Sequence, residues 1–236
     1  DFIFEIEDTE KLYVNKINIL GNNITSEKYI RNLLIVDEGD PFNKILHNKS
    51  LNKLRSKNLF QKVESKIIDT ENSDQKDIDI IIEEKPTGEV MAGAGYGSDG
   101  STFSVGVKEN NFKGEGVNLN TKLTLTEQTI KGFFEYTHPN FAYSDRELST
   151  SLESSVTDKL TDFGYKSSLN KVSLGTRYEQ FENTFFSPRL SISNEVLDTT
   201  STASAAYKKQ EGSYFDTTFD YGLTFDKRNS AYQPSS

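Results

Sequence analysis

The stretch EKPTGEVMAGAGYG, residues 84–97, divides this chain into two parts of different character. Pro86 has a fixed φ and no backbone N–H, and it biases Lys85 away from the helical region. A strand that arrives over residues 78–84 therefore ends here. Beyond it, small apolar residues alternate with glycines, which predicts a strand with one weak face. We place a domain boundary at this stretch.

The composition excludes several kinds of functional site. The chain has 236 residues, and a hydrophobic fraction of 34% is low for two soluble domains with large cores. It has no cysteine, and its only histidines, His47 and His138, lie in different halves, so we expect no metal site and no cofactor. The net charge of −9 is spread over both halves, so no basic patch for nucleic acid stands out.

No segment predicts a membrane helix or a signal peptide. No run approaches the ~20 apolar residues that a membrane helix needs. Residues 1–7, DFIFEIE, are neither basic nor long enough for a signal peptide, and their alternation is typical of a strand that ends a preceding unit. Because the chain begins and ends within patterned sequence, we expect it to be a fragment of a longer protein.

Residues 10–86 predict a small α+β unit with two helices on one face of a short sheet. The first helix is expected after a cap at Thr25 or Ser26 and before Asp37, with an apolar stripe formed by Tyr29, Ile30, Leu33 and Leu34. The second is expected over residues 43–58, with Ile45, Leu46, Leu51 and Leu54 inward. Strands are expected at residues 12–20, 61–69 and 76–84, which completes the order β-α-α-β-β.

From Gly88 onward the sequence predicts only strands, with no helix between them. Alternation is clearest over residues 117–125 and 215–225, and aromatic residues gather near the expected strand ends, as in the girdles of a membrane barrel: Tyr136, Phe141, Tyr143, Tyr178, Phe181, Phe185 and Phe186. A soluble β-sandwich fits the same pattern equally well. The eight strands are expected at about residues 89–98, 101–110, 115–126, 127–138, 145–157, 167–181, 185–198 and 213–226.

No constellation of catalytic residues can be assembled. Residues 95–100 read G-x-G-x-x-G, but a dinucleotide site needs a helix after this motif, and the pattern here predicts a strand and therefore a hairpin turn. Asp77 and Asp79 occupy alternate positions of one strand, which is more typical of a solvated face than of acid/base chemistry. No nucleophile has a base partner, so we predict that the protein is not an enzyme.

Several motifs, taken in order, resemble a POTRA domain. They are residues 13–22 (YVNKINILGN), Ile30-Arg31, residues 38–43 (EGDPFN) and the run from Leu54 through Leu59-Phe60 to Val63. Followed by EKPTG and GAGYG, they resemble the last POTRA domain and the barrel start of the Gram-negative bacterial family that assembles outer-membrane β-barrels. The resemblance implies a preceding POTRA domain that ends in residues 1–9, a last POTRA domain at 10–86, and the N-terminal half of a barrel at 87–236.

The resemblance also implies a fold, a location and a function. The fold is an α+β POTRA domain followed by an antiparallel transmembrane barrel, of which roughly eight of sixteen strands are present. The protein would fold and insert β-barrel proteins into the outer membrane, with its POTRA domain in the periplasm. Its partners would be the lipid bilayer, unfolded β-barrel clients and periplasmic accessory lipoproteins, one of which would contact Glu38 and Gly39. From the residues alone, that pair is a helix stop.

By resemblance, the first barrel strand forms a lateral gate at which a client strand pairs. Its glycines contribute no packing on one face and cost backbone entropy, so this edge should unpair easily. The alternative is that the glycines permit curvature or close approach. Two other functions are open: a related translocation or secretion pore with POTRA domains, and a soluble periplasmic binding module built as a β-sandwich. The predicted pairing residues are Gly88, Glu89, Val90, Met91, Ala92, Gly93, Ala94, Gly95, Tyr96 and Gly97.

Overall fold

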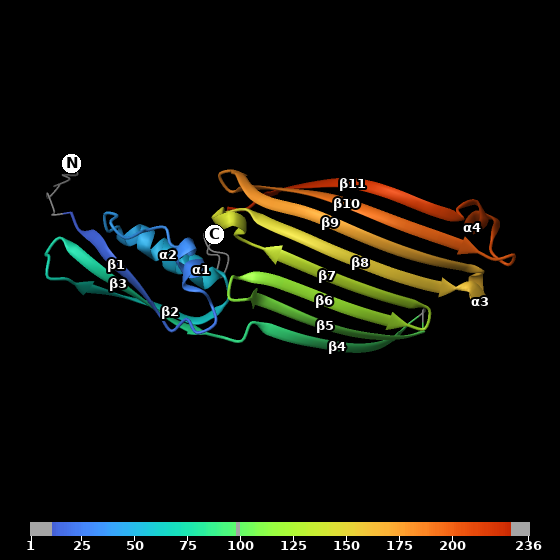
Figure 1. The fold of residues 1–236 in the computed structure, drawn as a ribbon, viewed down its shortest axis with the longest axis horizontal. Helices are drawn as coiled ribbons and strands as arrows, with labels where there is room; N and C mark the ends of the chain where they lie inside the picture. Colours follow the sequence, from blue (N-terminus) through green and yellow to red (C-terminus); the bar gives the residue numbers. More distant parts are fainter. Residues whose placement is uncertain (1–10, 98–99, 228–236) are drawn as a thin grey trace, which may run out of the picture. The chain divides into compact units, whose positions relative to one another are not determined.

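The computed structural model describes residues 11–97 and 100–227, so the interpretation of residues 1–9 as the end of a preceding domain lies outside the described part. The chain divides into two compact units (Figure 1). The first reaches Pro86 and also takes in Lys113–Glu115, and the second comprises the other described residues from Thr87 to Lys227. Within the described ranges, none of the helices has the length and apolarity of a membrane-spanning helix.

The first unit has the predicted order β-α-α-β-β. Its sheet has the strand order β1-β3-β2, with β3 parallel to β1 and antiparallel to β2. Both helices contribute to one hydrophobic core with the sheet (Figure 1). The elements are β1 (Tyr13–Leu20), α1 (Glu27–Leu33), α2 (Lys44–Ser56), β2 (Phe60–Asp69) and β3 (Gln75–Glu84).

Polar caps and one glycine fix the local geometry of this unit. Ser26 is the N-cap of α1, where its Oγ accepts a hydrogen bond from the backbone N–H of Tyr29 (3.2 Å). Asn43 caps α2 in the same way through its Oδ1. Gly21 adopts a φ of +88°, and a Cβ there would lie 2.1 Å from the carbonyl oxygen of Ile82, so only glycine fits the turn after β1.

The expected inward faces are confirmed for α1 and partly wrong for α2. Ile30, Leu33 and Leu54 are nearly inaccessible to solvent, as their spacing predicted. Ile45, predicted to face inward, is 68% exposed. The buried stripe of α2 is centred on Leu54, and at ~100° per residue Ile45 lies about half a turn from that centre.

The second unit is one antiparallel sheet of eight strands, as predicted. Each strand pairs with its neighbours in sequence, and β4 and β11 are the two edges of the sheet (Figure 1). In the described residues these edges do not pair with each other, so the sheet is open. The strands are β4 (Gly88–Gly97), β5 (Gly100–Phe112), β6 (Val117–Thr126), β7 (Thr129–His138), β8 (Glu147–Lys159), β9 (Tyr165–Phe181), β10 (Thr184–Thr199) and β11 (Gly212–Phe225).

The two faces of this sheet differ in polarity and exposure. Across β8, β9 and β10 one register row holds Leu152, Val172 and Ile192, which are 46%, 53% and 42% exposed. The next row, on the opposite face, holds Ser151, Ser173 and Ser191, all of which are buried. We call the face of Leu152 the outer face and the face of Ser151 the inner face. This confirms the predicted alternation of apolar and polar residues.

The prediction that no helix lies between the strands is wrong, because the connections contain short helical segments. They are η1 (Phe141–Tyr143), α3 (Leu160–Phe163) and α4 (Ala205–Lys209). Segments of this length show no helical period of apolar residues, so a pattern search cannot find them. α3 ends at Gly164, which has a φ of +72°, and Ser204 caps α4.

The predicted aromatic residues of the strands gather at one end of the sheet. Tyr136 lies near the end of β7, Tyr178 and Phe181 near the end of β9, and Phe185 and Phe186 at the start of β10. The opposite end carries aromatics that the sequence analysis missed. There the ring of Tyr165, which follows α3, stacks on the ring of Tyr207 in α4, with centroids 4.2 Å apart. Tyr136, Tyr178 and Phe186 lie on the outer face at the first end and suit a membrane interface, whereas Tyr165 lies on the inner face.

Candidate functional site

β4 is a strand with one free side in the described chain. It pairs with β5 along its whole length, from Gly88 opposite Glu109 to Gly97 opposite Gly100. Every residue of β4 is exposed. An edge strand presents backbone donors and acceptors that can pair with another chain. The ten residues predicted to pair with a client strand are therefore together on one accessible edge. The turn residues 98 and 99 of the predicted hairpin lie outside the described ranges, but the strand predicted after them is β5.

The local geometry does not require the last glycines of β4. A Cβ built at Gly95 or Gly97 meets no described atom within 4 Å, and at Gly93 the nearest atom is the Ser104 Oγ at 3.0 Å. None of these three glycines has the positive φ that favours glycine. Crowding by described residues therefore does not explain Gly95 and Gly97. Reduced packing with a higher entropic cost of ordering, and curvature of the sheet, are the two predicted roles that this geometry leaves open.

The start of β4 is fastened to the end of β5. The hydroxyl of Thr87 donates a hydrogen bond to the carboxylate of Glu109. The carbonyl oxygen of Thr87 accepts two more, from the backbone N–H (3.2 Å) and the side-chain amide (3.0 Å) of Asn110. The N-terminal end of β4 is thus held on β5 by hydrogen bonds, and its C-terminal end is rich in glycine.

Glu38 satisfies the backbone of β1 on the side that does not pair with β3. Its Oε1 accepts a hydrogen bond from the backbone N–H of Ile17 at 2.9 Å. Arg31 donates to the carbonyl oxygen of the same Ile17 at 2.7 Å and to Glu38 at 3.3 Å. The hydrogen bond from Ile17, followed by the interactions with Arg31 and Lys16, outweighs desolvation and lowers the pKa of Glu38.

Gly39 begins a segment that covers the start of the same edge. Its N–H donates to the carbonyl oxygen of Val14 (2.7 Å), and the N–H of Val14 donates to the carbonyl oxygen of Asp40 (2.9 Å). Gly39 has a φ of +94°, which favours glycine. Glu38 and Gly39, predicted to contact a lipoprotein, therefore form an exposed turn with a structural role in this domain.

Glu84 binds a loop that sequence reasoning did not connect to it. Its carboxylate accepts hydrogen bonds from three successive backbone N–H groups, those of Asn23 (2.8 Å), Ile24 (2.8 Å) and Thr25 (2.6 Å). Desolvation is the largest single influence and acts to raise the pKa of Glu84, but the hydrogen bonds from Thr25 and its two neighbours together lower it. The partners are about 60 residues apart, so no local sequence signal marks this contact.

The remaining candidate groups have structural partners. Asp77 and Asp79 accept hydrogen bonds from the side-chain amides of Asn15 (2.7 Å) and Asn18 (2.8 Å) on β1. His47 is buried with its Nε2 2.8 Å from the Oγ of Ser65, and burial lowers the pKa of this imidazole. Across residues 11–97 and 100–227 there is no group of three or more His, Cys, Asp or Glu side chains that could hold a metal ion.

Family models match both units of the chain. A model described as surface antigen variable number repeat, or POTRA, matches residues 12–85. A model described as the Omp85 superfamily domain matches residues 92–236.

Curated relatives carry the name outer membrane protein assembly factor BamA. The Neisseria meningitidis protein is 27% identical over 169 residues, which is 65% of this chain and 21% of the relative. The Nitratidesulfovibrio vulgaris protein is 21% identical over 100% of this chain and 30% of the relative. The Buchnera aphidicola protein is 29% identical over 62% of this chain and 24% of the relative. The chain thus spans less than a third of the length of these relatives.

Solved structures share the fold. BamA from Haemophilus ducreyi lacking POTRA domains 1–3 aligns with a TM-score of 0.71 and 23% identity, over 94% of this chain and 46% of that structure. CdiB from Acinetobacter baumannii aligns with a TM-score of 0.54 and 13% identity, over 91% of this chain and 42% of that structure. At these identities the likeness shows the fold alone.

Proposed function

Because the chain belongs to the Omp85 superfamily and carries a POTRA domain ahead of the superfamily domain, we propose that it is part of the core subunit that folds and inserts β-barrel proteins into the bacterial outer membrane. The name shared by its curated relatives, outer membrane protein assembly factor, favours this function. The sheet lies in the outer membrane and the POTRA domain in the periplasm. The exposed apolar outer face suits lipid, and the polar inner face suits a wet lumen.

The observation that carries the mechanism is the free side of β4. A client strand pairs with it through main-chain hydrogen bonds, which depend little on the client's side chains. The glycines at the far end weaken the pairing of β4 with any neighbouring strand. The hydrogen bonds of Thr87 with Glu109 and Asn110 hold the start of β4 on β5. Strand exchange at such an edge needs no ATP and no catalytic residue.

The exposed turn at Glu38 and Gly39 is the proposed contact for an accessory lipoprotein. It projects from the POTRA surface, and its conformation is fixed by the hydrogen bonds to Ile17 and Val14. A rigid, exposed turn presents the same surface to each partner molecule, which reduces the entropy lost on binding.

The related alternative is a translocation or secretion pore with POTRA domains. The likeness to CdiB structures means that the fold does not separate the two functions. The names of the curated relatives favour assembly.

The direct test is assembly of a client barrel by the full-length protein in phospholipid vesicles, followed by the heat-modifiable migration of the folded client. We expect acceleration of client folding, and we expect replacement of Gly93, Gly95 and Gly97 by valine to slow it roughly tenfold, the effect of about 1.4 kcal/mol. Gly222→Val on β11 is the matched control. Full-length protein that leaves client folding at the rate of empty vesicles would contradict the proposal and favour a pore.

A further inference from the structure

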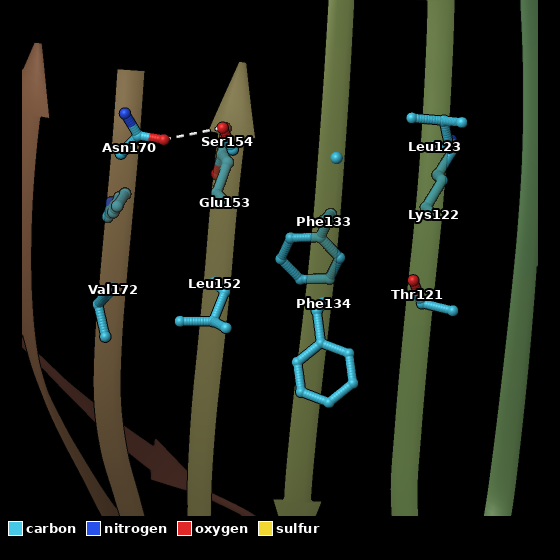
Figure 2. Close-up of a pocket in the computed structure, with 12 residues that line it drawn as sticks. Thr121, Lys122, Leu123, Phe133, Phe134, Leu152, Glu153, Ser154, Asn170 and Val172 are labelled. Carbon is cyan, nitrogen blue, oxygen red and sulfur yellow. Dashed lines mark hydrogen bonds between the residues drawn. The ribbon is translucent and has the colours of Figure 1, made fainter. Parts of the chain in front are cut away.

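The outer face of the barrel sheet contains a shallow hollow of about 460 Å³ over β6, β7, β8 and β9 (Figure 2). All four strands are paired on both sides, so the hollow does not depend on the open edges of the sheet. The outer-face residues that line it are Thr121, Leu123, Gly132, Phe134, Leu152, Ser154, Asn170 and Val172.

The hollow exists because Gly132 has no side chain. Gly132 lies between Leu123 and Ser154 in one register row of the outer face. Its φ is not positive, and a Cβ there would meet only the carbonyl oxygen of Ser154, at an ordinary 3.9 Å. Neither the backbone nor its neighbours therefore require glycine at this position. A glycine in mid-strand weakens the strand, so its presence calls for another reason.

The walls of the hollow are apolar and one end is polar. Figure 2 shows Leu152 and Val172 on adjacent strands and Phe134 beside them. Leu123 lies opposite Gly132 on β6. At the β9 end, the Oγ of Ser154 donates a hydrogen bond to the Oδ1 of Asn170 at 2.8 Å. The NH₂ group of Asn170 is directed away from Ser154 and supplies two donors (Figure 2).

The apolar band of the outer face locates this hollow in the membrane. Outer-face apolar residues are centred near Gly93 on β4 and near Asp220 on β11. Followed from strand to strand, the residue of β11 in register with Gly93 is Tyr214. The band centre on β11, Asp220, lies six residues farther along that strand. At ~3.3 Å per residue and ~4.8 Å for each of the seven strand spacings, this shift is a slant of roughly 30°. This slant is close to the strand tilt of membrane barrels.

With that slant, the apolar and polar parts of the hollow lie at different depths. On β7 the band is centred between Ile130 and Tyr136, so Gly132 lies near mid-membrane. On β9 the outer-face apolar residues begin at Val172, and Asn170 lies beyond them, toward the membrane surface farther from the start of β4. The hollow thus runs from the apolar middle of the membrane toward a hydrogen-bond donor.

We propose that this hollow binds one acyl chain of a membrane phospholipid, with the ester carbonyl of the lipid accepting a hydrogen bond from the Asn170 amide. The walls match a hydrocarbon chain, and the amide provides a donor in a region where unpaired polar groups are costly. The site does not involve strand pairing at β4. A failure of lipid binding here would therefore leave the proposed assembly function untouched, and the reverse also holds.

The test is photolabelling of the full-length protein in vesicles of phosphatidylethanolamine and phosphatidylglycerol that contain a small fraction of phosphatidylethanolamine with a diazirine on its acyl chain. Labelled residues are mapped by mass spectrometry. We expect labelling of Leu123, Phe134 and Leu152 to exceed that of Leu190, an outer-face residue outside the hollow, by roughly three- to tenfold. Gly132→Leu fills the hollow and should abolish this excess.

Two further variants separate a site from general lipid contact. Thr150→Leu places the same leucine side chain on the outer face outside the hollow and should leave the excess unchanged. Asn170→Leu keeps the walls and removes the donor, and should reduce the excess. Equal labelling over the whole outer face, or an excess that survives Gly132→Leu, would mean contact with surrounding lipid only and would overturn the proposal. Heat-modifiable migration and client assembly check that each variant is folded.

Discussion

The first strands of the two units, β1 and β4, are both edge strands, but only the free side of β1 is covered by other residues. The free side of β1 is covered by its own domain: Gly39 and Asp40 pair with Val14, and the side chains of Glu38 and Arg31 take up the N–H and the carbonyl of Ile17. In the described residues, the free side of β4 has no such cover. An exposed edge invites unwanted pairing, and proteins usually block it. An accessible β4 edge is what the proposed pairing with a client strand requires.

The two units also differ in what they bury. The first unit has a single core in which both helices cover the sheet. In the second, the buried hydrophobic residues among those described are only Val117, Leu197 and Ala203, and most of the exposed large apolar side chains of the strands lie on the outer face. The first unit is therefore stabilised by its own core, whereas we expect the second to need lipid and further strands for stability.

The largest expected effect follows from separating the units. Residues 10–86 expressed alone should give a dispersed amide spectrum and a cooperative melt, since both the core and the covered β1 edge are complete within them. Residues 88–236 should not fold stably in water, because their sheet has two open edges and an apolar face. A heat-modifiable, protease-resistant monomer formed by 88–236 in detergent would break the comparison.

Within the first unit, core truncation should have the next largest effect. Leu54 is fully buried, so Leu54→Ala should lower the free energy of unfolding of residues 10–86 by ~2–5 kcal/mol, measured by urea denaturation. Ile45→Ala on the same helix is the control and should change it by less than ~0.5 kcal/mol, because Ile45 is exposed. Equal losses for both variants would show that the helix is packed the other way round.

Glu84→Gln should cost less, about 1–3 kcal/mol in the same measurement. The variant removes the charge from a group that accepts three backbone hydrogen bonds from Asn23, Ile24 and Thr25. Glu83→Gln, at the exposed neighbouring position, is the control. An unchanged stability would mean that the neutral amide oxygen of glutamine accepts these hydrogen bonds as well as the carboxylate does.

The smallest effect is a pH dependence of the isolated first unit. Burial lowers the pKa of His47 below 6.5, so stability should fall as the pH drops below 6.5, where the unfolded chain binds a proton that the folded domain does not. The lowered pKa values of Glu38 and Glu84 mean that their contributions are present above 4.5 and lost as the pH falls below it. His47→Gln should remove the upper step in a pH series of denaturation curves, and Glu38→Gln should weaken the lower one.

The sequence predicts most elements here because their boundaries are marked locally. Pro86 ends β3, Ser26 and Asn43 cap the helices, and strict alternation marks the barrel strands. The failures have physical causes as well. Ile45 fits an apolar stripe in the sequence, but the stripe that faces the core lies on the other side of α2. Segments as short as α3 have no periodicity to detect.

The candidate site divides in the same way. The composition of β4 is visible in the sequence, and the structure adds its register with β5 and its pinned start. The roles of Glu38 and Glu84 depend on backbone groups more than 20 residues away, which only the fold brings close. The hollow at Gly132 requires the register of four strands at once.

The central claim, that β4 is kept open for a client strand, is tested most directly by cysteine crosslinking. Single cysteines at each position from Glu89 to Gly97 in the full-length protein are paired with cysteines along the terminal strand of a stalled client. We predict crosslinks to the client in one consistent register along β4. Crosslinks only to the protein's own closing strand, with none to client, would contradict the claim and leave the glycines of β4 with a structural role alone.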